Sequence, residues 1–136
     1  MIIDTVKVTY DTLHPDQKLT DFLAFCREVK MRYEGNAREA EDKEAQLQDL
    51  EHYAELYKDL DIQRGFALYA KIRDTRRARR SLKSENELLY PVYAWILANE
   101  DALNGMAGVL GSVRKAEEAI NSRKYMTRTN VLDGKA

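Results

Sequence analysis

Apolar residues recur along most of this chain at alternating steps of three and four positions, which is the spacing of one face of an α-helix. The first such stripe comprises Leu19, Phe22, Leu23, Cys26, Val29 and Tyr33. Pro15 and Asp16 precede it, and both suit the first turn of a helix. The stripe reaches Gly35, and Asn36 with Glu39 three positions on resembles a capping pair. We therefore predict a helix that breaks or bends near Gly35.

Two further stripes predict a helical hairpin. The first is a narrow seam, typical of coiled-coil-like packing, and comprises Ala37, Ala40, Leu47, Leu50, Ala54, Tyr57 and Leu60. A turn is expected at residues 59–61. The second stripe comprises Phe66, Tyr69, Ile72, Arg76, Leu82 and Leu89. Pro91 interrupts this second helix, but apolar residues continue through Val92, Trp95 and Ile96, so we expect a kink near residues 87–91 instead of a stop.

A last helix is expected after a turn at residues 99–101. Its core face comprises Leu103, Met106, Leu110, Val113 and Ile120. Gly105, Gly108 and Ser112 form a small-residue edge on the same segment. Because glycine in a helix costs about 1 kcal/mol relative to alanine, we expect a neighbour to pack closely against this edge.

The two ends of the chain lack helical spacing. Val6, Val8 and Tyr10 alternate with polar residues, which is a strand-like period. A lone strand leaves its backbone groups unpaired, so residues 1–12 are expected to form an extended arm that lies on the helices or pairs with another copy or a partner. Residues 124–136 are expected to form an irregular tail. The sequence thus predicts an all-α single domain over residues 1–136, an elongated helical hairpin or bundle of three to four helices.

Charge is divided between the two arms of the predicted hairpin. Residues 38–60 hold eight acids and three bases, whereas residues 64–83 hold eight bases and one acid. Folding at residues 60–61 would put residue i near residue 121 − i, so that Glu44 faces Arg77 and Asp42 faces Arg79. We therefore predict a coiled-coil-like acidic/basic antiparallel pair. Six bases crowd residues 73–83 and wrap around the helix at about 100° per residue, so some of them point outward.

Candidate chemistry is sparse. Cys26, the one cysteine, excludes an intrachain disulfide and lies on an apolar stripe, so we expect it in the core. Asp49 and His52 have the spacing of helical metal sites, but the facing arm near Tyr69 offers bases instead of carboxylates. We predict no metal, no cofactor and no enzymatic activity. We expect no signal peptide, no apolar run approaches about 18 residues, and the net charge is −1. We expect a cytoplasmic protein that does not enter a membrane.

The hairpin resembles a group of small proteins encoded by bacteriophages and prophages of Gram-positive bacteria. The matching residues are Asp49-Leu50-x-His52-Tyr53-x-Glu55-Leu56, Ile72-Arg73-x-x-Arg76-Arg77-x-x-Arg80-x-x-Lys83-x-Glu85-x-Glu87-Leu88-Leu89-Tyr90-Pro91 and Arg123-Lys124-Tyr125-x-x-Arg128. The resemblance covers about half of the chain and carries no catalytic residue. It implies a phage gene product that acts in the cytoplasm of a bacterial host. By analogy, small phage proteins without catalytic motifs often bind and block a host enzyme or an antiviral-defence factor.

The function predicted is therefore binding of a host or defence protein, without catalysis. The candidate partner-binding residues are Arg76, Arg79, Arg80, Lys83, Tyr93 and Trp95. Two alternatives stay open for them: that the arginines pair within the hairpin, and that the aromatic residues belong to the core. A nucleic-acid-binding accessory protein that uses Arg73–Lys83 is the alternative function, although the acidic arm would repel phosphates. Apolar surface at Leu19, Phe22, Leu23 and Tyr33 predicts a homodimer.

Overall fold

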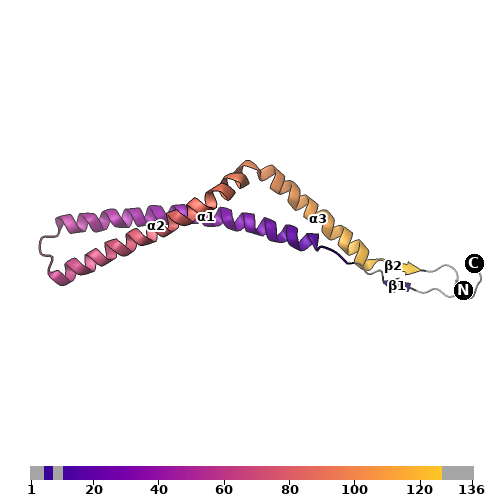
Figure 1. Ribbon diagram of the computed structural model, residues 1–136, viewed down its shortest axis with the longest axis horizontal. Helices are drawn as coiled ribbons and strands as arrows, with labels where there is room; N and C mark the ends of the chain where they lie inside the picture. The colour runs from indigo at the N-terminus through magenta and orange to yellow at the C-terminus, as the bar shows by residue number, and fades with distance from the viewer. Residues whose placement is uncertain (1–4, 8–10, 127–136) are drawn as a thin grey trace, which may run out of the picture. The chain divides into compact units, whose positions relative to one another are not determined.

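The protein is all-α. The computed structural model describes residues 5–7 and 11–126, and the side chains of residues 11–123. In this part of the chain three helices follow one another, flanked by two three-residue strands (Figure 1). The elements are β1 (Thr5–Lys7), α1 (Pro15–Leu56), α2 (Ile62–Ala98), α3 (Glu100–Ser122) and β2 (Lys124–Met126).

Helix α1 is continuous over 42 residues, so the predicted break near Gly35 is wrong. The capping pair that suggested a break does not form, because the Asn36 side chain instead donates hydrogen bonds to Glu85 and Asn86 on α2. The segment after Gly35 is rich in alanine and glutamate, which favour helix strongly. Together these effects offset the cost of one glycine within the helix.

The predicted turns lie close to the observed ones. Helix α1 ends at Leu56 and α2 begins at Ile62, where the Asp61 carboxylate accepts a hydrogen bond from the Arg64 N–H at 2.7 Å and caps the helix. Helix α2 passes through Pro91 without stopping, as predicted. Asn99 alone separates α2 from α3, and its side chain donates to the Trp95 carbonyl.

The segment Thr5–Lys7 is paired, which corrects the prediction of a lone arm. It forms an antiparallel two-stranded sheet with Lys124–Met126, in a register that matches Val6 with Tyr125. The prediction of an irregular tail is therefore wrong for these three tail residues, whose short run shows no alternation that would mark a strand. The rest of the predicted arm and tail, apart from residues 11 and 12, lies outside the described residues.

The chain divides into two compact units, Phe25–Asn99 and Met1–Ala24 with Glu100–Ala136. In the first unit α1 and α2 run antiparallel and bury one stripe each at alternating steps of three and four. On α1 the least exposed residues include Cys26, Val29, Tyr33, Asn36, Ala40, Lys43, Leu47 and Leu50. On α2 they include Leu68, Ile72, Thr75, Arg79, Leu82, Asn86, Leu89, Tyr93 and Ile96. We call this shared stripe the seam.

The register of the seam follows from the hydrogen bond between Asn36 and Asn86. Residue i of α1 faces residue 122 − i of α2, one position away from the predicted register. The seam is a narrow core, since in the described residues of this unit only Cys26, Val29, Ala40, Leu47 and Ile96 are buried apolar residues. The placement of Cys26 in the core is confirmed.

In the second unit, α3 presents the predicted apolar stripe, with Leu110 buried and the other members half-buried. Arg114 donates a hydrogen bond to the Thr20 hydroxyl at 3.2 Å and so joins α3 to the start of α1. The prediction that a neighbour packs closely against the small-residue edge is wrong for the described residues. A Cβ atom added at Gly105 or Gly108 would meet nothing within 4 Å among them. Among the described residues, this edge is therefore not a close-packing surface. No described helix has a stretch apolar enough to cross a membrane.

Candidate protein-binding surface

Four of the predicted partner-binding residues line one groove between α1 and α2. Arg76, Arg79, Arg80 and Lys83 all project from α2 into this groove, which has a volume of about 820 Å³. Its other charged residues are Glu44 and Glu51 from α1 and Glu87 from α2. The groove, which we call the charged groove, therefore presents both signs of charge.

Two of the four bases are paired within the hairpin. Arg76 Nη2 lies 3.2 Å from Glu51 Oε1, and Arg79 Nη2 lies 3.5 Å from Glu44 Oε2. Two acids of α1 therefore pair with two bases of α2, but the predicted partners are wrong, because Glu44 contacts Arg79 and not Arg77. The predicted partners came from distance along the helices alone, without the rotation of each residue around the helix axis. Arg77 is two positions from Arg79 and therefore points about 200° away from it.

The other two bases are available. Within the part of the chain that the structure describes, Arg80 and Lys83 make no ion pair, and both are exposed. The hydrogen bonding of the Arg79 guanidinium is incomplete, because its Nε is buried without an acceptor in the described residues. The positive charge that remains in the charged groove thus comes from Arg80 and Lys83.

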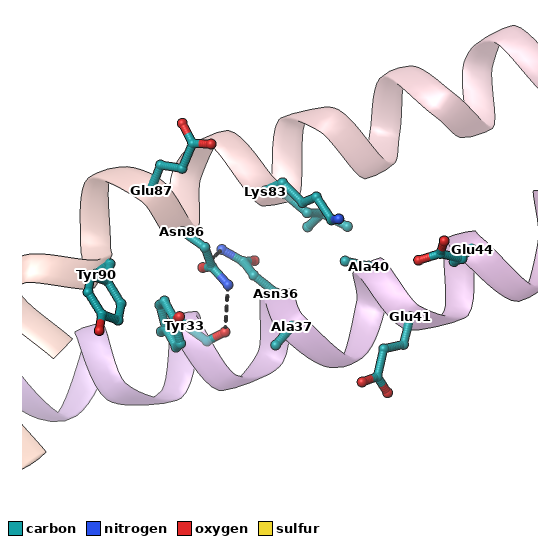
Figure 2. Close-up of a pocket in the computed structure, with 11 residues that line it drawn as sticks. Tyr33, Asn36, Ala37, Ala40, Glu41, Glu44, Lys83, Asn86, Glu87 and Tyr90 are labelled. Carbon is teal, nitrogen blue, oxygen red and sulfur yellow. Dashed lines mark hydrogen bonds between the residues drawn. The ribbon is translucent and has the colours of Figure 1, made fainter. Parts of the chain in front are cut away.

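A second groove adjoins the first and is largely apolar. It has a volume of about 560 Å³ and shares Glu44, Lys83 and Glu87 with the charged groove. Its apolar lining residues are Tyr33, Ala37, Ala40, Leu82 and Tyr90. Figure 2 shows small alanines on α1, with the tyrosines toward one end and Glu44 toward the other. We call it the apolar hollow, and it exists because α1 presents methyl groups where larger side chains would fill the space.

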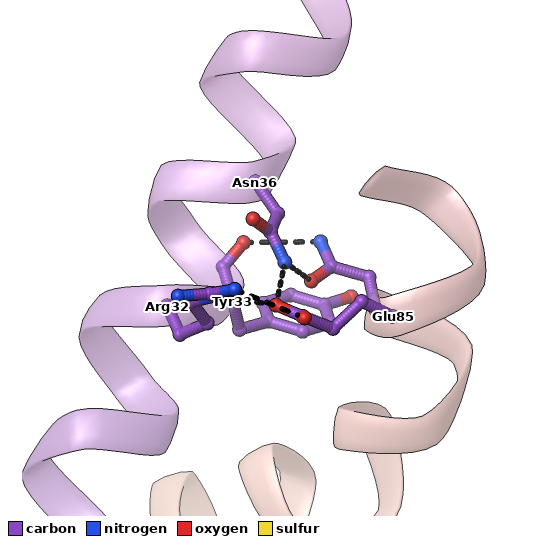
Figure 3. Close-up of polar contacts among 5 residues, drawn as sticks. Arg32, Tyr33, Asn36 and Glu85 are labelled. Atoms are coloured by element: carbon purple, nitrogen blue, oxygen red, sulfur yellow. Dashed lines mark hydrogen bonds and ion pairs between the residues drawn. The ribbon is translucent and has the colours of Figure 1, made fainter. Parts of the chain in front are cut away.

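A polar cluster crosses the seam beside this hollow (Figure 3). Asn36, only 6% exposed, donates to Glu85 Oε1 at 2.8 Å and to Asn86 Oδ1 at 3.0 Å. Asn86 in turn donates to the Tyr33 carbonyl at 3.0 Å. Arg32 binds both oxygens of Glu85, at 2.5 and 3.2 Å. This cluster was not predicted from the sequence, although an asparagine within an apolar helical stripe is a usable signal of register.

The charged members of the cluster shift each other's titration. Hydrogen bonds from Arg32 and then from Asn36 lower the pKa of Glu85 below its ordinary value of 4.5. The same hydrogen bond raises the pKa of the Arg32 guanidinium. Both shifts favour the ionised pair that spans the two helices.

The two predicted aromatic residues line neither groove. Tyr93 is half-buried and stacks on Tyr33, with ring centroids 4.0 Å apart and planes 17° apart. Burial, followed by the nearby Glu34 carboxylate, raises the pKa of the Tyr93 hydroxyl. Tyr93 is therefore a packing residue of the seam, as the core alternative held. Trp95 is 45% exposed and lines neither groove.

Metal-binding and redox-active side chains are scattered over the described part of the chain. In the described residues there is no group of three or more His, Cys, Asp or Glu side chains that could hold a metal ion. His52 lies with Asp49 and Tyr53 along a shallow hollow of about 310 Å³. Burial raises the pKa of the Cys26 thiol, which disfavours the reactive thiolate.

Comparison of the chain with protein-family models, with curated proteins and with solved structures finds no match. The resemblance to phage-encoded proteins therefore stays a prediction, and the residues themselves are the basis for a function.

The polar cluster should contribute measurably to stability. Asn36→Ala would remove both donors to α2 and leave the Asn86 and Glu85 oxygens without these bonds. We expect the free energy of unfolding to fall by about 1 to 3 kcal/mol, measured by urea denaturation. The matched control is Asn104→Ala on the exposed surface of α3, for which a change within about 0.5 kcal/mol is expected. Equal effects of the two substitutions would contradict the assignment.

The shifted titration of Glu85 predicts a dependence of stability on pH. Because the pKa of Glu85 is lower in the folded protein than its ordinary 4.5, its contribution is fully present above that pH. The contribution is lost as the pH falls through the lower, folded value. The stability difference between wild type and Glu85→Gln should therefore shrink on acidification, as measured by urea denaturation from about pH 6 to about pH 3. Arg32→Gln should reduce the same dependence, and a difference that is constant with pH would refute it.

The observed ion pairs predict which residues are energetically coupled. A double-mutant cycle of Glu44→Gln and Arg79→Gln should give a coupling energy of about 0.2 to 1 kcal/mol, since both side chains are partly exposed. The control cycle combines Glu44→Gln with Arg77→Gln and should give a coupling near zero. A larger coupling in the control cycle would restore the register predicted from sequence.

Proposed function

We propose that this protein is a non-enzymatic protein-binding module whose partner occupies the grooves between α1 and α2. We further propose that α1 and α2 form a coiled-coil-like pair. The support for the pair is the burial of residues at alternating steps of three and four on both helices.

The observation that carries the proposal is the position of Arg80 and Lys83. These unpaired bases line a charged groove that adjoins an apolar hollow. Charge accelerates and orients an encounter, whereas burial of an apolar anchor supplies most of the affinity. The two grooves offer both contributions on neighbouring surfaces.

The kind of partner is proposed from the resemblance to phage-encoded proteins. It is a host protein or a component of an antiviral defence, which the module would bind and inhibit or modulate in the bacterial cytoplasm. The proposal requires no cofactor and no metal. The central binding residues are now Arg80 and Lys83. Arg76 and Arg79 are the paired bases beside them. Tyr93 and Trp95 line neither groove.

Nucleic-acid binding through Arg73–Lys83 is the second candidate function. The observation in its favour is that Arg77, Arg80 and Lys83 make no ion pair in the described residues. Against it, Glu44, Glu51 and Glu87 line the same groove and would repel phosphates.

Self-association is a further proposal, with a surface different from the one expected. Of the four residues expected to form it, Leu19, Leu23 and Tyr33 are half-buried and Phe22 is 42% exposed. The end of the hairpin is more open, because Leu56, Ile62, Phe66 and Tyr69 are 60 to 93% exposed. We propose this hairpin end as the contact between two copies, which leaves the grooves free.

The function is tested by affinity capture from a Gram-positive host lysate. Wild type should retain a specific protein, and Arg80→Glu/Lys83→Glu should lose it. The matched control is Arg38→Glu/Arg77→Glu, which makes the same change of charge at exposed residues that line neither groove. Partner lists that are identical for all three proteins, or empty, would contradict the proposal.

Labelled DNA and RNA are titrated in parallel at low and moderate salt. Binding that weakens steeply with salt and is lost in Arg80→Glu/Lys83→Glu would favour the second candidate instead.

A further inference from the structure

The charged groove and the apolar hollow lie on one flank of the seam, since three residues line both of them. Their lining on α2 extends from Arg76 to Tyr90, which corresponds to about 21 Å of helix. This length matches about four turns of a second helix laid alongside. We call this surface the groove flank.

The groove flank has the residue pattern of a helix pair that receives another helix. Arg76, Lys83 and Tyr90 follow one another at intervals of seven on α2 and lie beside the seam positions. In a two-helix coiled coil such flanking positions are usually charged along their whole length. Here the last of the three is a tyrosine, which is 56% exposed. An apolar face that widens from the seam to one flank is typical of a helix in a larger bundle.

We propose that the groove flank binds a single amphipathic α-helix of a partner protein, which packs against α1 and α2 as a third helix. This inference rests on the proposed function and names the structural element that the partner supplies. A large apolar side chain of that helix fills the tyrosine end of the apolar hollow, beside Ala37 and Tyr90. Carboxylates of the same helix pair with Arg80 and Lys83.

The charges of the groove flank set the spacing within the partner helix. Glu41 and Glu87 line the apolar hollow and disfavour an acid there. Lys83 and Arg80 lie seven and ten positions before Tyr90, which is roughly 10 to 15 Å along the helix. The partner helix therefore carries its apolar anchor two to three turns away from its acidic residues, on the same face.

A second copy of this chain is the competing occupant of the groove flank. Its helix α1 is acidic, and Met31 and Leu56 on that helix are 74 and 75% exposed. The test therefore includes the oligomeric state of the protein. Nucleic acid is disfavoured by the three glutamates of the charged groove and gains nothing from an apolar hollow.

The test uses two synthetic helical peptides of about 22 residues, long enough to span the groove flank. Both carry leucine at helical spacing, and they differ only in a pair of glutamates or lysines placed two to three turns from one end. Fluorescence anisotropy should show about tenfold tighter binding of the glutamate peptide, equivalent to about 1.4 kcal/mol. Arg80→Glu/Lys83→Glu should reverse this preference.

A second pair of variants tests the apolar hollow. Ala37→Trp would fill the hollow from an exposed position and should abolish binding of both peptides. The matched control is Ala45→Trp, an exposed alanine on the same helix that lines neither groove, and it should bind like wild type. Circular dichroism checks that both variants remain helical.

The possible results separate this inference from the proposed function. Equal affinity for the two peptides, no binding of either, or full binding by Ala37→Trp would overturn the third-helix inference. If host capture still depended on Arg80 and Lys83, the proposed function would stand without it. If light scattering gave a dimer that Ala37→Trp converted to a monomer, the occupant would be a second copy. Displacement of the bound peptide by RNA at low salt would identify nucleic acid as the occupant and also overturn the inference.

Discussion

The seam between α1 and α2 depends on one buried polar contact, the hydrogen bonding of Asn36 to Glu85 and Asn86. Most of the seam consists of leucine and other apolar side chains, which would tolerate several alignments of the two helices. Asn36 is 6% exposed, and away from its partners its amide would be buried without hydrogen bonds, which costs about 1 to 3 kcal/mol. The contact therefore selects one alignment, and Arg32 strengthens it by binding Glu85 from the same turn of α1.

Both grooves follow from that alignment. It brings Glu44 and Glu51 within reach of Arg79 and Arg76, so these four charges are used inside the hairpin. Arg80 and Lys83 make no ion pair in the described residues. It also sets Ala37 and Ala40 opposite Leu82, where small side chains leave a hollow. A slip of one turn would pair different charges and close or move the hollow, so the surface proposed for binding is a consequence of register.

Sequence periodicity was sufficient for the helical segments, the turns and the apolar stripe of α3, because burial of one face dominates all three. The predicted stripe of α2 was wrong at Phe66, Tyr69 and Arg76, which are exposed. Periodicity was insufficient at Gly35 and Asn36, where a local capping signal competed with a contact fifty positions away in the chain. The partners of the arginines were also wrong, since pairing depends on the side of the helix as well as on distance along it. The β1–β2 pair was missed because Lys124–Met126 is too short to show a period. Of the candidate binding residues, the sequence identified the four basic residues that line a groove, but Tyr93 packs in the seam.

The position of the polar contact also bears on how the hairpin forms. The five residues between α1 and α2 close a short loop, so contacts near Leu56 and Ile62 can form early and the two helices can then zip together. Asn36 and Asn86 meet only after several turns have paired. A hairpin that pairs in a shifted alignment would therefore bury the Asn36 amide without hydrogen bonds, so that further pairing of the helices would stabilise it little. The same contact that fixes the final structure thus acts as a late checkpoint in folding, far from the point where folding begins.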